Sequence, residues 1–300
     1  MNRVGVWCAA GAVVGTVLGT MAGAILLSAQ TTQIPEPRRG SGASVTGAFE
    51  GWYYNPDGSR SFLVGYYNRN SQQTLDIPIG PNNRIEPGGP DQGQPTHFLP
   101  RRQWGLFTIP APANLGNTKL TWTLVANGQA TTVPINMDPL WEIAPFGEAS
   151  VDNTPPTLRL EERGPSAQGP RGITLSLTTT VQNPLPLTVW VADDAKTFPG
   201  AKLPPDPPLT VTWSKFRGPG AVTFANPAPP VEKADFPGGP GAPGAGASGK
   251  ATTTATFSEP GEYVLRVVAN DWSGDGGRGA QCCWTNGQVK VSVRAEAGGR

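Results

Sequence analysis

GKATTTATFSEPGEYVLRVVANDWS, residues 249–273, contains two alternating runs separated by a Pro-Gly pair. In Thr252–Ser258, hydroxyl side chains occupy every second position, a period of two that is typical of a strand with one face against a core. Pro260-Gly261 predicts a turn, and Tyr263–Val268 repeats the alternation. We therefore predict two strands that pair as an antiparallel hairpin.

Further strands are predicted on both sides of this stretch. Leu209–Phe216 (LTVTWSKF) and Ala221–Phe224 lie upstream, and the turn-forming residues 217–220 (RGPG) separate them. Gln288–Val293 supplies a last strand downstream. Earlier strands of the same domain are expected at Leu158–Leu160, Ile173–Val181 and Leu187–Val191.

The carboxy-terminal strands resemble a known repeat. Residues 209–224 (LTVTWSKFRGPGAVTF) followed by 253–271 (TTATFSEPGEYVLRVVAND) are similar to the PKD-type immunoglobulin-like repeat, over roughly the last third of the chain. That repeat is found in bacterial surface proteins and as an accessory module of secreted enzymes. The WDFGDG motif of many PKD repeats is missing here, and the stretch between the matching segments is longer. The resemblance implies the fold and leaves the activity open, because such folds host many functions.

The composition agrees with a β-rich chain. The 300 residues allow two compact domains, each with its own core. The 39 glycines and 33 prolines disfavour long helices and favour short strands joined by turns. A formal net charge of +1 provides no field that would attract nucleic acid, so no nucleic-acid partner is expected. We predict an all-β protein with two immunoglobulin-like or β-sandwich domains after an N-terminal membrane-targeting helix.

The amino terminus predicts export. Arg3 precedes an uncharged run, residues 4–27, which is long enough to cross a bilayer as a helix and would contact the membrane if it is retained. Residues 1–29 are therefore expected to be a signal peptide or a membrane anchor, and a modest small-residue cleavage site leaves both open. The glycines of this segment recur every four residues and would share one helix face, which predicts self-association of a retained anchor. They are Gly11, Gly15, Gly19 and Gly23.

Local patterns predict the remaining organisation. Residues 30–46 are expected to be a flexible linker. An amino-terminal β domain is expected over 47–136, a connector over 137–156 and the PKD-like domain over 157–295. Inside the last domain, the Gly- and Pro-rich stretch 226–249 has little to bury and is expected to be a flexible insertion.

The amino-terminal domain is predicted to begin with a hairpin. Phe49–Tyr54 and Ser61–Asn68 flank the turn-forming residues 55–58 (NPDG). Trp52 and Tyr54 would share one face of the first strand by alternation, and with Tyr66 they are a candidate aromatic platform for a sugar ring, or alternatively part of the core. Other strands are expected at Thr74–Ile79, Gln103–Ile109, Lys119–Val125 and Ala130–Ile135.

Few residues suggest catalysis. His97 is the only histidine, so any arrangement of a nucleophile, a histidine and an acid must use it; a polar loop histidine is the simpler interpretation. Glu50, Glu142 and Glu148 are carboxylates of the kind that flank a glycosidic bond in hydrolases, but one sequence does not show that they converge. We predict that the chain is not an enzyme.

The segment after residue 270 contains two candidate sites. Asp271, Ser273 and Asp275 alternate with a glycine-containing turn, as in the first half of a calcium loop, although an ordinary inter-strand turn has the same composition. Cys282-Cys283 follows, and removal of the amino-terminal segment would leave this pair in an oxidising compartment. A vicinal disulfide, one buried and one exposed thiol, and an intermolecular crosslink are the three alternatives. No cofactor besides calcium is predicted.

These patterns predict an exported binding or structural module without catalytic activity, located in the periplasm or at the cell surface, membrane-anchored or secreted. Its expected partner is a protein or glycan of the cell envelope. Two alternatives are an accessory carbohydrate-binding protein and a secreted hydrolase of unrecognised type.

Overall fold

The computed structural model describes residues 39–112, 119–148, 151–196, 206–236, 246–271 and 282–296. The regular elements in these ranges are β-strands, with the single exception of a 3-10 turn, η1 (Pro139–Trp141). The all-β prediction is thus confirmed. Arg38–Arg300 forms one compact unit, and within the described ranges no helix has the length and apolar character needed to span a membrane. The predicted targeting helix and its four spaced glycines lie outside the described residues.

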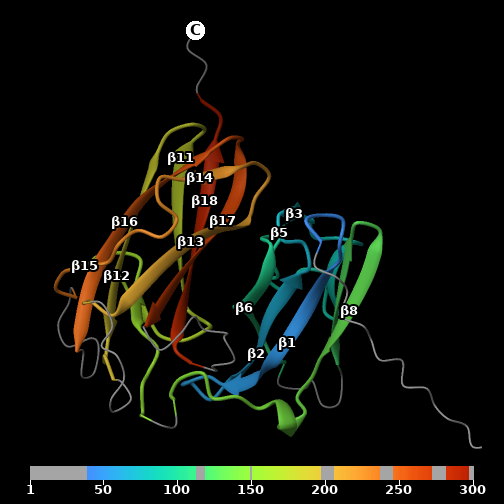
Figure 1. Ribbon diagram of the computed structural model, residues 1–300, viewed down its shortest axis with the longest axis horizontal. Helices are drawn as coiled ribbons and strands as arrows, with labels where there is room; N and C mark the ends of the chain where they lie inside the picture. The colour runs from blue at the N-terminus through green and yellow to red at the C-terminus, as the bar shows by residue number, and fades with distance from the viewer. Residues whose placement is uncertain are drawn as a thin grey trace, which may run out of the picture. The chain divides into compact units, whose positions relative to one another are not determined.

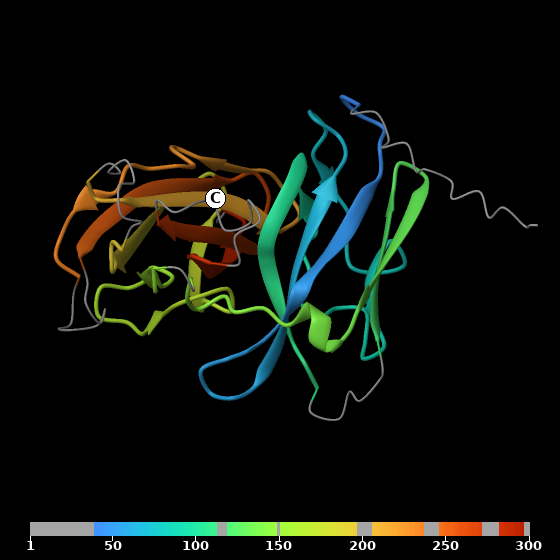
Figure 2. The ribbon, with the colours of Figure 1, turned by 60° about the horizontal axis from the view of Figure 1, so that its bottom comes forward.

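The amino-terminal part is a sandwich of two three-stranded sheets (Figure 1). One sheet has the antiparallel order β1 (Val45–Tyr54), β2 (Arg60–Asn68) and β6 (Arg101–Pro110). The other has the order β4 (Asn83–Glu86), β7 (Leu120–Ala126) and β8 (Gln129–Ile135). A short pair, β3 (Leu75–Asp76) with β5 (His97–Phe98), accompanies them. Figure 2 shows β1, β2 and β6 as one layer and the green β7–β8 hairpin as the other.

Aromatic side chains fill the space between these sheets. Trp122 is buried and donates its indole N–H to Asn83 Oδ1 at 3.0 Å, so its one polar atom is satisfied. Phe107 packs edge-on against Trp122, with ring centroids 5.5 Å apart. A Cβ atom at Gly47 would lie 2.6 Å from the Trp122 ring, so this glycine allows β1 to approach β7 closely. The β1–β2 hairpin was predicted and is confirmed by its antiparallel register.

The carboxy-terminal part is a second sandwich. Its first sheet has the order β10 (Ser166–Ala167), β9 (Thr157–Arg159), β12 (Leu185–Asp193), β16 (Ala247–Phe257) and β14 (Val222–Phe224), with β15 (Glu232–Lys233) paired to β16. Its second sheet has the order β11 (Ile173–Thr180), β18 (Trp284–Arg294), β17 (Gly261–Asp271) and β13 (Leu209–Arg217). β11 and β18 are parallel. The central orders β9-β12-β16-β14 and β13-β17-β18 match the two sheets of an immunoglobulin-like sandwich.

The predicted hairpin within residues 249–273 is wrong. β16 and β17 belong to different sheets, and Pro260-Gly261 carries the chain from one sheet across to the other. Phe257 and Tyr263, on either side of this connection, pack edge-on across the core with ring centroids 4.8 Å apart. A hairpin and a crossing between sheets produce the same alternation, because in both cases each strand buries one face.

Several predicted limits also differ from the structure. β1 begins at Val45, inside the predicted linker, and Asn70 Oδ1 accepts a hydrogen bond from the Ala43 backbone N–H at 2.7 Å. Only Leu75–Asp76 of the strand predicted at Thr74–Ile79 forms, while β4 was not predicted at all. Part of the 226–249 stretch is regular: β15 and the start of β16 lie in the first sheet of the carboxy-terminal sandwich, and Pro227 O accepts from Trp213 N of β13, in the second sheet, at 2.7 Å.

Candidate functional site

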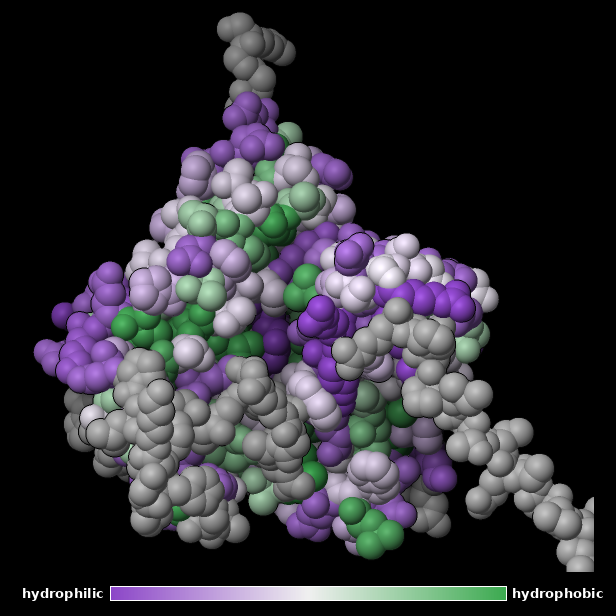
Figure 3. Space-filling view, in the orientation of Figure 1, coloured by the Kyte–Doolittle hydropathy of each residue, from purple (hydrophilic) through white to green (hydrophobic). Residues whose placement is uncertain are grey.

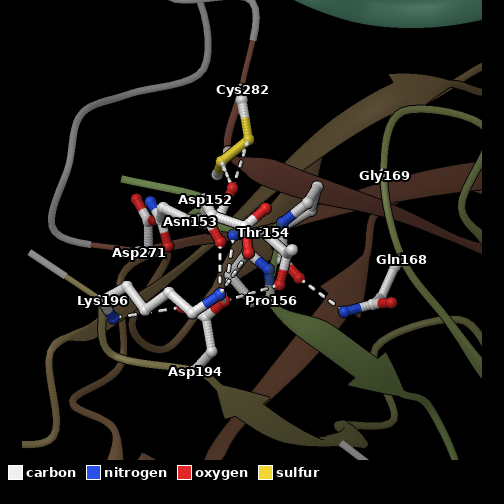
Figure 4. Close-up of a disulfide and its surroundings, with 12 residues drawn as sticks. Asp152, Asn153, Thr154, Pro156, Gln168, Gly169, Asp194, Lys196, Asp271 and Cys282 are labelled. Carbon is white, nitrogen blue, oxygen red and sulfur yellow. Dashed lines mark hydrogen bonds and ion pairs between the residues drawn. A yellow bond between two sulfur atoms is a disulfide. The ribbon is translucent and has the colours of Figure 1, made fainter. Parts of the chain in front are cut away.

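The Cys282–Cys283 pair forms a vicinal disulfide in a buried part of the carboxy-terminal sandwich (Figure 4). The two cysteines are 5% and 0% exposed and directly precede β18. Both sulfur atoms face the backbone carbonyl oxygen of Asn153, at 3.8 Å and 3.5 Å. The disulfide therefore packs on the segment between β8 and β9, which links the two sandwiches.

Aspartate side chains surround the same segment. Asp271, at the end of β17, accepts a hydrogen bond from Asn153 Nδ2 at 2.6 Å, and the two side chains lie next to each other in Figure 4. Asp193, at the end of β12, accepts from the Ala195 backbone N–H at 2.7 Å. Asp271 and Asp193 are only 3% and 2% exposed. Strand ends from both sheets thus bring two buried carboxyl groups to the disulfide region.

A second layer of polar contacts fixes the linking segment from outside. Asp194 Oδ2 accepts from the backbone N–H and the hydroxyl of Thr154, at 3.1 Å and 2.9 Å. Lys196 Nζ lies 3.1 Å from Asp152 Oδ2 and 3.7 Å from Asp194 Oδ2. Figure 4 shows Lys196 reaching both aspartates. These contacts hold residues 152–154 against the end of β12.

The surroundings of Asp193 raise the pKa of its carboxyl group. Burial raises the pKa of Asp193 to about 7, and the negative charges of Asp271 and Asp194 act in the same direction, while the Ala195 N–H opposes them. Two buried oxygens, Asp193 Oδ1 and Asn153 Oδ1, have no hydrogen-bond partner in the described ranges. Buried oxygens of this kind need a donor, a proton or a cation.

Of the three predicted calcium ligands, only Asp271 is among the residues that the structure describes. Asp271 lies in this cluster, whereas Ser273 and Asp275 lie outside the described residues. Within the described part, no group of three or more His, Cys, Asp or Glu side chains has the geometry to hold a metal ion. Neither Asp193 nor Asn153 was predicted from the sequence. The Asp-Asp pair at the end of the predicted strand over residues 187–191 was the available signal.

His97 lies in β5, not in a free loop. Its Nδ1 is 2.8 Å from Asp76 Oδ1, and Lys215 Nζ donates to the same oxygen at 3.1 Å. Burial lowers the pKa of His97. In the described residues, no serine, threonine or cysteine makes a hydrogen bond to the imidazole. Because Lys215 belongs to β13, this group links the two sandwiches.

The three candidate glutamates have different settings. Glu50 is partly buried and accepts hydrogen bonds from Arg102 Nη2 at 2.8 Å and from the Gly105 backbone N–H at 2.7 Å. Burial raises its pKa, and the Arg102 guanidinium opposes the rise. Glu142 is exposed just after η1, and the backbone of Glu148 pairs with Asn153. Glu50 thus serves an internal ion pair.

The aromatic platform does not form as an exposed surface. Trp52 and Tyr66 are 5% and 1% exposed and belong to the amino-terminal core, whereas Tyr54 is 53% exposed. Trp52 and Tyr54 do share a face, with ring centroids 5.4 Å apart. The correction has a packing reason: η1 follows β8 and covers Trp52, whose indole N–H donates to Asp138 O at 2.8 Å.

A buried arginine joins the sandwiches. Arg266 of β17 donates to Asn286 Oδ1 through Nε at 3.1 Å and Nη2 at 2.7 Å, and lies 3.4 Å from Gly105 O of β6. Asn286 Nδ2 donates to Gly105 O at 2.9 Å. Burial lowers the pKa of Arg266 to about 10, and the negative charge of Glu50 opposes this change. At neutral pH the guanidinium is therefore charged.

Apolar contacts surround this arginine. Trp284 forms a cluster with Tyr53 and Leu63 of the amino-terminal sandwich. Phe216 of β13 packs into the amino-terminal core, with its ring centroid 6.4 Å from that of Phe107. The sandwiches are therefore joined by a mixed apolar and ionic interface. This interface was not predicted from the sequence.

Comparisons with known proteins find only low-scoring similarities to solved structures. No protein-family model matches the chain, and no curated protein matches it. Domains 4 and 5 of the S-layer protein SbsC are 11% identical, with a TM-score of 0.20 over 84% of this chain and 98% of that chain. The D00-D0 domain of intimin is 12% identical, with a TM-score of 0.23 over 83% and 99%. Zebrafish RET cadherin-like domains 1 to 4 are 11% identical, with a TM-score of 0.23 over 74% and 46%. At these scores, the fold assignment depends on the strand order described above.

Proposed function

We propose that the chain is an exported binding or structural module of the cell envelope that does not act as a catalyst. The buried Cys282–Cys283 disulfide carries this proposal. Disulfides form and persist in oxidising compartments and are rare where thioredoxin and glutathione keep thiols reduced. The uncharged run at residues 4–27 provides a route for export, and the similarity to PKD-type repeats is consistent with a surface role.

The interface between the sandwiches favours a structural rather than a catalytic role. Buried polar and apolar contacts through Arg266, Asn286 and Trp284 favour a fixed relation between the two parts. His97 is engaged with Asp76, and Glu50 with Arg102. Both groups thus have structural partners across or within the sandwiches. A rigid pair of sandwiches suits a spacer or a binding platform.

Export and the disulfide are tested together. We expect cells expressing the full chain to hold it in the envelope or medium fraction. When the protein is alkylated under denaturing conditions, the tryptic peptide of residues 279–290 should take up no alkyl group without reductant and two after reduction. A cytoplasmic chain that is alkylated without reductant would contradict the proposal. Sequencing the mature amino terminus distinguishes an anchored form, in which the spaced glycines can mediate self-association, from a cleaved form.

We also propose that calcium binds beside the disulfide, through Asp271, Ser273 and Asp275. Calcium is a hard cation that takes oxygen ligands from carboxylates, amides and carbonyls, and the unpartnered Asp193 Oδ1 and Asn153 Oδ1 supply two more oxygens in this region. At a calcium concentration 100 times the Kd, the free energy of unfolding should rise by about 2.7 kcal/mol.

Thermal melting of the purified chain in calcium and in chelator measures this effect. Asp271→Asn should abolish the difference between the two conditions, whereas Glu262→Gln, an exposed position on the same strand, should preserve it. Identical melting temperatures of the unmodified chain in calcium and chelator would end the proposal.

A further inference from the structure

A cleft of about 450 Å³ opens where the end of β2 meets the start of β6. Its lining consists of residues 67–71 together with Arg101, Arg102 and Trp104. This volume falls in the range of about 300–1,000 Å³ that is typical of small-ligand sites. The cleft lies apart from the disulfide cluster, on the amino-terminal sandwich. Its lining includes three arginines and no carboxylate.

One arginine of the cleft is held in a fixed position. Arg102 Nη1 donates to the carbonyl oxygens of Tyr66 and Gln103, at 3.0 Å and 2.7 Å, and Nη2 donates to Glu50 Oε1 at 2.8 Å. The Arg102 guanidinium stacks on Trp104, with its Cζ atom 3.8 Å from the ring centroid. Ordering of this group before a ligand arrives reduces the entropy cost of binding. Glu50 forms its ion pair with Arg102.

The other two arginines add positive charge at the surface. Arg69 lies over the ring of Tyr67, with its Cζ atom 5.3 Å from the centroid. Arg101 is exposed, and in the described residues its guanidinium forms no ion pair. Its backbone has a φ of 71° and donates to Asn70 O at 3.3 Å. This left-handed conformation sets Arg101 at the turn into β6, beside Asn70.

We propose that this cleft binds an acidic saccharide, a sugar unit that carries a carboxylate or sulfate group. Guanidinium groups bind such anions in a bidentate manner. Trp104, which is 39% exposed, and Tyr67 provide aromatic surfaces for the apolar face of a sugar ring.

An acidic peptide fits the cleft less well. The backbone N–H of Arg69 donates to Ser44 O at 3.1 Å and that of Arg101 to Asn70 O at 3.3 Å, so these two positions offer an added strand no donor. Figure 3 shows hydrophobic residues in separate patches among hydrophilic ones on the face drawn. The inference deepens the proposed function, because envelope location is what would bring the cleft to a glycan.

Calorimetric titration of the purified full chain tests the cleft. Tetragalacturonate and a chondroitin sulfate tetrasaccharide represent carboxylated and sulfated sugars, cellotetraose is the neutral control, and tetraglutamate is the peptide control. We expect binding of at least one acidic saccharide, no binding of cellotetraose, and an affinity that falls as salt is raised. Stronger binding of tetraglutamate, or equal binding of cellotetraose, would overturn the proposal.

Variants locate the binding. Arg101→Gln and Trp104→Ala should each raise the Kd for the acidic saccharide at least tenfold, with an unchanged melting temperature for Arg101→Gln because that side chain is exposed. Arg163→Gln, an exposed arginine of the carboxy-terminal sandwich, removes the same charge and should leave the Kd unchanged. An Arg101→Gln variant with the unmodified Kd would refute the assignment. Failure here leaves the proposed function intact, because cell fractionation and the state of the disulfide decide that question independently.

Discussion

Replacing Arg266 with methionine is expected to lower the free energy of unfolding by about 1–3 kcal/mol, the cost typical of leaving a buried hydrogen-bond acceptor without its donor. The methionine fills a similar volume but donates no hydrogen bond, so Asn286 Oδ1 loses both of its donors. Glu50 also loses a nearby positive charge inside the interface. Chemical denaturation followed by tryptophan fluorescence measures the change, provided that the transition is two-state.

Arg217→Ala is the matched control for this experiment. Arg217 also joins the two sandwiches, through Asp91 at 2.8 Å and 3.0 Å, but Asp91 is half exposed and solvent screens the pair. Exposed pairs of this kind contribute about 1 kcal/mol or less. If Arg217→Ala proved as costly as Arg266→Met, burial would not be the reason for the effect.

Arg266 also shows which features of a strand the alternation of residues predicts and which it does not. In the stretch Tyr263–Val268, a period of two correctly predicted a strand, and the structure places Tyr263 and Leu265 of this strand in the core. It left Arg266 on the opposite face, which would be solvent in an isolated sandwich. That face is covered by the other sandwich, and the neighbours Val264 and Val268 pack there as well. A local pattern contains no information about which second surface will cover an outer face.

The same limit explains the errors in the candidate site. The hairpin prediction failed because local alternation does not distinguish pairing within a sheet from packing between sheets. The prediction of an exposed aromatic platform was wrong because η1, about 90 residues further along the chain, covers Trp52. Conversely, the cysteine pair was found because adjacency is visible in the sequence. Asp193 and Asn153 were not found, because only the fold brings these distant positions beside Asp271.

Replacing Gly105 with alanine is the second change expected to have a large effect. Gly105 has a φ of +48°, and a Cβ atom there would lie 2.3 Å and 2.7 Å from two ring carbons of Trp284. Its N–H donates to Glu50 Oε2 and its carbonyl oxygen accepts from Asn286, so the backbone has little freedom to move away. A left-handed backbone costs alanine about 1–2 kcal/mol and overpacking about 1–3 kcal/mol. We therefore expect a loss of about 2–5 kcal/mol in the free energy of unfolding.

Two further variants separate these causes. Gly58 has a φ of +79° with no atom within 4 Å of an added Cβ, so Gly58→Ala measures the cost of the backbone conformation alone. Trp284→Phe removes the ring atoms that the methyl group introduced by Gly105→Ala would meet. It sacrifices no hydrogen bond, because the buried Trp284 Nε1 has no acceptor in the described ranges.

In the Gly105→Ala background, Trp284→Phe should therefore cost less than it does alone, with a favourable coupling of about 0.5–3 kcal/mol. Additive effects would mean that Gly105 and Trp284 do not touch in solution. Since these two residues belong to different sandwiches, additivity would also remove the packed interface from which the rigid module was inferred. The double-mutant cycle thus tests the geometry on which the structural role depends, independently of any ligand.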